Sequence, residues 1–247
     1  MILTCYTEWL LTTNLLSRTM RTRKTVLFTI LLFLLCSCND ADYYYSTMFT
    51  SCYSNIDSIH LEISKGDSNL LLIGVSDSYY ASIADDDKTT INQLAAKHND
   101  TSYNKMIAYA KEGNWTEEGH GGWRQDFVRI DITSNADYDE THKARTLLND
   151  IIRLRSTTVY PYIMSGYTKT FDWSTTKYIA RPECHLIDGL LSELSSEDLI
   201  MAGWENSTVY AELYFVKYPT HSRQHRLTIV MESDEGEIFT DSLDLIF

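Results

Sequence analysis

The stretch HRLTIVMESDEGEIFTDSLDLIF, residues 225–247, decides the fold of this chain. Its two halves, residues 225–232 and 238–246, are rich in apolar and β-branched residues and are typical of strands. The sequence DEG at residues 234–236 lies between them and predicts a tight turn. The stretch therefore predicts an antiparallel β-hairpin.

Strand patterns recur upstream of this hairpin. Ile59, Leu61 and Ile63 alternate with polar residues, and an apolar run follows at residues 70–75, which predicts a second hairpin. Further strands are predicted at residues 127–133, 151–154, 157–164 and 209–216, with Pro161 at an edge or a bulge. About eight strands with local pairing favour a mainly β fold, an antiparallel sandwich with short helical insertions, over a parallel α/β sheet.

Helical periodicity is confined to short segments. Residues 85–113 change to helical spacing with a polar break at their centre, which predicts two short helices in an insertion over about residues 88–112. A short helix is also predicted within residues 141–150. Ser196 is expected to cap a helical turn that Gly203 ends.

A leader with the layout of a secretory signal precedes the β region. Arg21, Arg23 and Lys24 form a basic segment, and residues 25–35 form an uncharged apolar run. This run is about half as long as the roughly 20 residues of a spanning helix, which disfavours a transmembrane anchor. Such signals normally begin with their basic residues, so we expect translation to start at Met20, with a natural extended leader as the alternative.

The sequence LCSC at residues 35–38 resembles the lipobox of bacterial lipoproteins. The resemblance implies cleavage before Cys38 and acylation of this cysteine, and two or three acyl chains make such an attachment effectively permanent. Residues 1–37 are then the leader and signal peptide, residues 38–52 the acylated cysteine and its tether, and residues 53–247 a single domain.

The acidic residues that follow the lipobox bear on location. The sequence NDAD at residues 39–42 resembles the export signal of surface lipoproteins in Bacteroidetes, and a solvated acidic tether is the alternative. These resemblances predict a protein anchored by lipid to the outer membrane, on the cell surface.

The chain is strongly acidic. It contains 21 Lys and Arg against 34 Asp and Glu, a formal charge of −13. Removal of residues 1–37 takes away four basic residues and one acidic residue, which leaves a charge near −16. A chain of this charge is a poor match for nucleic acid and is repelled by anionic lipid headgroups, so we expect contact with the membrane only through the covalent anchor.

Cys52 and Cys184 are the cysteines that remain besides Cys38 in the mature chain, in an oxidising compartment. A disulfide between them would close a loop of more than about 100 residues and stabilise the fold by about 4 to 5 kcal/mol. Two separately buried thiols are the alternative, because spacing alone does not show whether the Cα atoms approach within about 7 Å.

Two internal segments carry a family resemblance. The sequences ITSNADYDETHKARTLLNDIIRL at residues 132–154 and YIMSGY at residues 162–167 are similar to segments of Bacteroidetes lipoproteins that share a domain of unknown function. With the lipobox and the final hairpin, the similarity covers most of the mature chain but not residues 85–113. It implies an immunoglobulin-like β fold on a lipid anchor, and it supplies no catalytic residues.

The most site-like segment is a loop predicted at residues 117–123, EEGHGGW. His120 lies beside glycines, which let the backbone approach a ligand, and Trp115 and Trp123 are candidates to stack on that ligand. A flexible surface loop without a ligand is the alternative.

Two further patterns concern modification and metal binding. Ser58 and Ser242 lie in the sequences DSI and DSL, which resemble the short O-glycosylation sequence of Bacteroidetes. His221 and His225 have a four-residue spacing, but they lack a helical context and a third ligand, so no metal site is predicted. No cofactor site and no known catalytic motif are predicted either.

The function predicted from these patterns is that of a non-enzymatic, lipid-anchored module that binds a glycan or another envelope protein, or that supports a surface complex. One alternative is a carbohydrate-binding accessory of a polysaccharide-uptake system, for which the chain's 17 tyrosines offer stacking surfaces. The other alternative is a hydrolase whose residues converge only in three dimensions.

Overall fold

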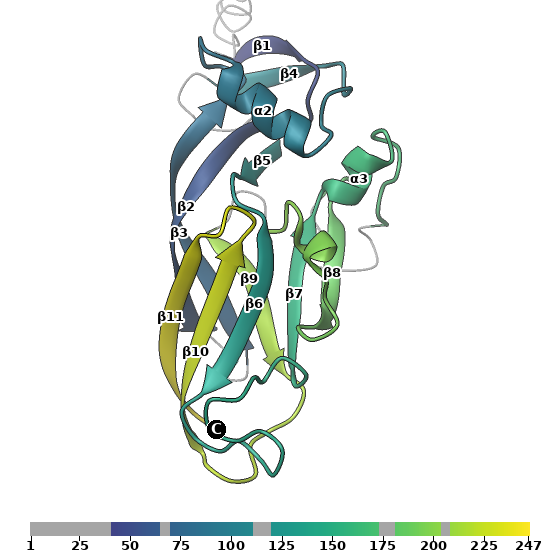
Figure 1. Ribbon diagram of the computed structural model, residues 1–247. Coiled ribbons are helices and arrows are strands. Elements are labelled where there is room, and N and C mark those ends of the chain that lie inside the picture. The colour runs from purple at the N-terminus through teal and green to yellow at the C-terminus, as the bar shows by residue number, and fades with distance from the viewer. Residues whose placement is uncertain (1–40, 65–69, 111–119, 173–180, 204–207) are drawn as a thin grey trace, which may run out of the picture. The chain divides into compact units, whose positions relative to one another are not determined.

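The structure is mainly β, as predicted. The computed structural model describes residues 41–64, 70–110, 120–172, 181–203 and 208–247 (Figure 1). Apart from the outer ends of strands β1 and β4, the elements below lie in the unit of residues 43–109 and 113–247. Within this described part, the strands form three sheets.

The predicted C-terminal hairpin is confirmed and forms most of a three-stranded antiparallel sheet. Strands β10 (Gln224–Ser233) and β11 (Ile238–Ile246) pair along their length. Gly236 adopts a φ of 80° in the turn, a left-handed conformation that glycine accepts without steric cost. Strand β6 (Phe127–Ser134), which was also predicted, pairs with the other edge of β10.

The larger sheet has six strands in the order β5-β2-β3-β9-β7-β8. All neighbours run antiparallel except β2 and β5, which are parallel. The hairpin predicted around residues 59–75 is confirmed as β2 and β3, and both strands extend beyond the alternating pattern. The six strands are β2 (Thr50–Ile63), β3 (Leu70–Ser82), β5 (His120–Trp123), β7 (Ile152–Thr158), β8 (His185–Leu190) and β9 (Val209–Phe215).

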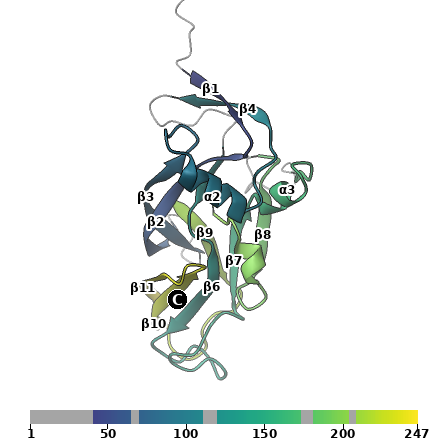
Figure 2. The same cartoon turned by 45° about the horizontal axis from the view of Figure 1, so that its top comes forward.

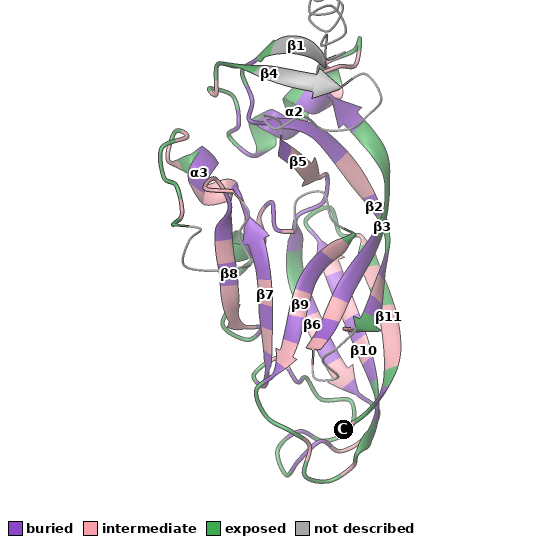
Figure 3. Cartoon of the chain, turned by 180° about the vertical axis from the view of Figure 1, so that it is seen from behind, coloured by how far each residue is buried: buried purple, intermediate pink, exposed green. Residues whose placement is uncertain are grey.

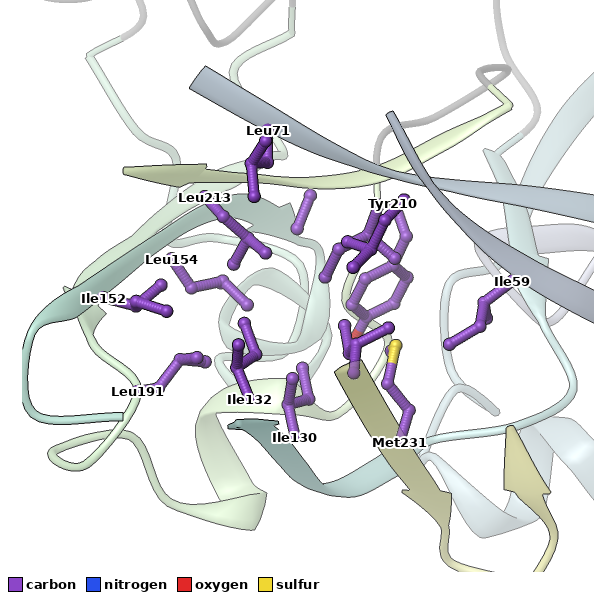
Figure 4. Packing of buried hydrophobic residues seen from close by; sticks show 14 of the residues in the cluster. Ile59, Leu71, Ile130, Ile132, Ile152, Leu154, Leu191, Tyr210, Leu213 and Met231 are labelled. Atoms are coloured by element: carbon purple, nitrogen blue, oxygen red, sulfur yellow. The ribbon is translucent and has the colours of Figure 1, made fainter. Parts of the chain in front are cut away.

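The main core fills the space between these two sheets. Buried and partly buried residues alternate along the strands of the larger sheet, as the view from behind shows (Figure 3). Each fully buried aliphatic side chain contributes about 1.5 to 3 kcal/mol. This packing of two antiparallel layers is consistent with a sandwich. The side chains labelled in Figure 4 are Ile59, Leu71, Ile130, Ile132, Ile152, Leu154, Leu191, Tyr210, Leu213 and Met231.

The helical insertion expected at residues 88–112 is helical only in α2 (Thr89–Lys97). The prediction of a second helix was wrong, because β4 (Lys105–Ala110) is a strand that pairs with β1 (Ala41–Ser46) (Figure 2). A six-residue helix has too few internal hydrogen bonds to be stable alone, whereas pairing with β1 gives the main chain its partners.

Residues 141–150 form turns and a bridge, so the helix predicted there was wrong. The carboxylate of Asp139 accepts the main-chain N–H groups of Thr141 and His142, each at 2.8 Å. A side chain that bonds to nearby N–H groups in this way stabilises a turn at the expense of a helix.

Residues 157–164 were predicted as a strand, yet β7 ends at Thr158 and helix α3 (Tyr160–Met164) follows. Pro161 lies in the first turn of α3, not at a sheet edge, and its missing N–H costs nothing there because first-turn N–H groups have no helical partner. The helical turn predicted after residue 196 is a 3₁₀-helix, η2 (Ser196–Leu199), and its cap is Ser195 instead of Ser196.

The folded region begins earlier than predicted. Residues 46 and 48–52 are buried, and the main-chain N–H groups of Phe49 and Thr50 donate to the carboxylate of Asp100, each at 2.7 Å. The tether predicted at residues 38–52 is therefore too long, because residues from about 46 onward are part of the domain.

Candidate binding pocket

A pocket of about 340 Å³ lies beside β8, the last strand of the larger sheet. This volume falls within the roughly 300 to 1,000 Å³ of small-molecule sites. Its walls come from residues 185–188 of β8, from Tyr160 and Pro161 of α3, and from Leu194, Glu197 and Asp198 around η2. Figure 1 shows β8 beside β7, with α3 above the upper ends of these two strands.

Hydrogen bonds hold the walls of the pocket in place. Strand β8 pairs with β7 from His185, opposite Thr158, to Leu190. The hydroxyl of Thr158 donates to the carbonyl of Ile200 at 2.7 Å and accepts the main-chain N–H of Tyr160 at 3.0 Å. Thr158 therefore connects the end of β7 to the starts of α3 and of the segment that follows η2.

The polar side chains of the pocket differ in how many hydrogen bonds and ion pairs they form with other protein groups. His185 is buried and its Nε2 donates to the carbonyl of Lys169 at 3.0 Å. Asp198 accepts the N–H and the hydroxyl of Ser195, and these hydrogen bonds lower the pKa of its carboxyl. Glu197 is exposed, and no ion pair to it occurs among the described residues. Glu197 is thus the carboxylate most open to a ligand.

Asp188 lines the pocket and also belongs to a row of charged side chains on the larger sheet, formed with Arg153 and Arg155. Arg153 Nε forms an ion pair with its carboxylate, and Arg155 Nη2 lies 3.4 Å from the other oxygen. Arg155 also lies over the ring of Tyr214, 4.8 Å from its centroid, and donates to its hydroxyl at 3.1 Å. The row fixes Asp188 and neutralises its charge.

The pocket combines an aromatic ring, apolar side chains and carboxylates, a composition that suits hydroxylated or cationic ligands. It also brings a histidine near carboxylates, which the hydrolase alternative requires. His185 and Asp198 are held by the partners described above, so this alternative stays a prediction. Among the described residues, no group of three or more His, Cys, Asp or Glu is arranged to hold a metal ion.

The ligand-binding loop predicted around His120 is not a loop in its described part. His120 belongs to β5, is buried, and stacks on Phe49 with ring centroids 5.3 Å apart. Trp123 is partly buried against the main core. Parallel pairing with β2 accounts for this burial, and Trp115 lies outside the described residues. The prediction of a ligand loop was wrong for His120 and Trp123.

No disulfide joins Cys52 to Cys184, and both thiols are buried, as the second of the two alternatives expected. Cys52 lies in β2, where burial raises the pKa of its thiol. Cys184 packs in an apolar cluster with Phe49 and Tyr162. Cys38 lies outside the described residues, and its acylation stays a prediction.

The remaining predicted residues do not come together. Ser58 is exposed on β2, whereas Ser242 is partly buried on β11 with its hydroxyl 3.0 Å from that of Thr228. His225 is buried, and its Nε2 donates to the carbonyl of Ser222 at 2.9 Å. His221 lies 3.5 Å from a carboxylate oxygen of Glu140. The glycosylation of Ser58 and Ser242 stays a prediction.

Sequence reasoning missed a buried polar cluster, which we call the Asp126 cluster. His98 lies at its centre, with Nε2 2.8 Å from Asp126 Oδ2 and Nδ1 3.2 Å from the hydroxyl of Tyr53. Lys97 Nζ is 3.0 Å from Asp126 Oδ2, and the Met201 N–H donates to Asp126 Oδ1 at 2.8 Å. The members of this cluster come from distant parts of the chain and share no sequence motif. No sequence pattern therefore predicts the cluster.

Comparisons with known proteins assign no relative. No family model, no curated protein and no solved structure matches the chain. In the described part of the chain, no helix has the length and apolar character needed to cross a membrane.

Proposed function

We propose that this protein is a lipid-anchored, non-enzymatic module of the outer membrane that binds an external partner in the pocket beside β8. The observation that carries this proposal is the pocket itself, which lies at the end of a sheet and has walls fixed by hydrogen bonds. Preorganised walls reduce the ordering cost of binding. The lipobox-like sequence around Cys38 supports the anchor.

The fold that we propose is a variant of the immunoglobulin-like sandwich, of the kind implied by the resemblance to Bacteroidetes lipoproteins. Two sheets that share one apolar core support it. The long β2–β3 hairpin and helix α2 are then additions to the common arrangement.

The anchor is tested by labelling cells with radioactive palmitate. We expect the label on the wild-type protein and on the Cys36→Ala variant, which keeps a small residue in the lipobox and serves as the matched control. The Cys38→Ala variant should carry none. Label that survives Cys38→Ala would overturn the anchor.

A carbohydrate-binding accessory of a polysaccharide-uptake system is the second candidate, because Tyr160 lines the pocket together with carboxylates. An aromatic ring beside hydrogen-bond acceptors is suited to a sugar ring and its hydroxyls. A glycan array with the mature protein tests this candidate. Binding should be lost in Tyr160→Ala and kept in Tyr218→Ala, since Tyr218 is 54% exposed and outside the pocket. An array without any bound glycan would reject it.

A further inference from the structure

Two of the sheet edges are covered in part by side chains that bond to the main chain of the edge strand. On β6, Asn149 accepts the N–H of Ile132 at 3.0 Å and donates to the carbonyl of Ile130 at 2.9 Å. On β2, the carboxylate of Asp241 accepts the N–H of Leu61 at 2.7 Å. Both side chains occupy positions that a further strand would otherwise take, a usual protection of sheet edges.

The outer edge of β8 has no such cover in the described part of the chain. The Leu191 N–H donates to the carbonyl of Ile152 at 2.9 Å, so residues 185, 187 and 189 also bond to β7. The main-chain groups of Leu186 and Asp188 therefore point away from β7. The Asp188 carbonyl accepts from Arg153 at 3.3 Å, and no described residue bonds to the other groups.

The pocket lies along this same stretch of strand. Residues 185–188 line it, and Tyr160 and Glu197 form parts of its other walls. An open strand edge gives a peptide main-chain hydrogen bonds, and an adjacent pocket selects one of its side chains. Binding of a peptide as an added strand requires an open strand edge and a side-chain pocket beside it, and β8 provides both.

We propose that the outer edge of β8 binds an extended segment of a partner polypeptide as an added strand, with a basic side chain of that segment in the pocket. The main-chain groups of Leu186 and the N–H of Asp188 bond to the segment. The exposed carboxylate of Glu197 and the ring of Tyr160 receive the cation. The formal charge of −13 also favours a basic partner. This inference rests on the proposed binding function and names the class of partner.

The test uses fluorescent synthetic peptides and the full lipidated protein in detergent micelles. One peptide of about ten residues alternates Thr and Val around a central Lys, and its companion has Glu in place of Lys. Fluorescence anisotropy measures the affinity of each. We expect the Lys peptide to bind and the Glu peptide to bind about tenfold more weakly, because Glu meets like charge in the pocket.

Two variants separate the edge from the pocket. Leu186→Pro removes an outward N–H at an edge position, which an edge strand tolerates, and also part of the side chain's packing against the cluster of Phe49 and Tyr162. Leu186→Val is its matched control, because it shortens the side chain but keeps the N–H. We expect Leu186→Pro to weaken binding of the Lys peptide about tenfold and Leu186→Val to leave it unchanged. Glu197→Gln should remove most of the preference for Lys over Glu.

A second readout on the wild-type protein covers the case in which Leu186→Pro fails to fold, as judged by near-ultraviolet circular dichroism. Hydrogen exchange of the Leu186 and Asp188 amides should slow when the Lys peptide is added. Unchanged exchange, absence of peptide binding, or equal affinity of folded Leu186→Pro and wild type would each overturn strand addition. If the protein binds a glycan, and Leu186→Pro binds that glycan as well as wild type does, strand addition would also be overturned. The proposed binding function would stand in that case.

Discussion

Replacement of Asp126 by asparagine gives the sharpest test of what holds the fold together outside the main core. Asp126 is 6% exposed, and its carboxylate contacts His98, Lys97 and the Met201 N–H at 2.8, 3.0 and 2.8 Å. Removal of one partner from a buried ion pair costs about 3 to 5 kcal/mol. Lys97 is partly exposed and keeps a second partner in Asp234 at 2.8 Å, so we take the lower value, about 3 kcal/mol.

This loss corresponds to a fall in Tm of about 6 to 12 °C for a domain of this size. The loss should also depend on pH. Burial alone would raise the pKa of the Asp126 carboxyl, but the hydrogen bond and charge of His98, the Met201 N–H and the charge of Lys97 outweigh it and lower the pKa. The stabilisation is therefore complete above the unfolded-state pKa of about 3.9 and is lost as the pH falls through the folded-state pKa.

Urea unfolding, followed by tryptophan fluorescence at neutral and acidic pH, measures this effect. Asp244→Asn is the matched control: its side chain is 77% exposed and lies 3.5 Å from Arg226, so its loss should stay within about 0.5 kcal/mol. An Asp126→Asn protein that unfolds within about 0.5 kcal/mol of wild type would refute the view that this cluster supports the fold.

Three further changes test other parts of the structure. Gly203→Ala should lower the Tm in a thermal melt, because Gly203 has a φ of 137° and a Cβ there would lie 2.3 Å from Trp123 Nε1. Asn149→Ala should cost about 1 to 3 kcal/mol in urea unfolding, since it leaves two main-chain groups of β6 without partners; an unchanged midpoint would contradict this. Burial lowers the pKa of His142, but the carboxylates of Asp150 and Asp139 raise it overall, so its stabilisation is complete below about pH 6.5 and is lost as the pH rises through the folded-state pKa. The difference in unfolding free energy between wild type and His142→Gln should therefore shrink above that pH, and a difference that grows would refute the assignment.

The hairpins could be predicted because each is decided locally. Alternation along residues 59–63 and 225–232 places one set of side chains in the core, and a shift of one residue would expose that whole set. Gly236 also favours the C-terminal hairpin, because glycine readily adopts the left-handed conformation that the turn requires. The mainly β class follows from these stretches alone.

The errors arise where distant residues decide the local structure. Residues 105–110 have helical spacing but pair with β1, and His120 lies beside glycines but is buried by pairing with β2 and stacking on Phe49. Neither partner is visible in the local pattern. The pocket is also assembled from β8, α3 and η2, which contribute no shared motif, so it could be found only in three dimensions.

The hydrogen bond between Leu61 and Asp241 joins residues 180 positions apart. Strand β2 lies near the start of the described chain. It therefore reaches its native environment only after β11 has been synthesised and has packed beside it. Contacts of such long range form slowly, because the chain between them must first be ordered. If export leads with the N-terminus, β2 crosses the membrane long before β11, and the two sheets can close only after both strands have crossed.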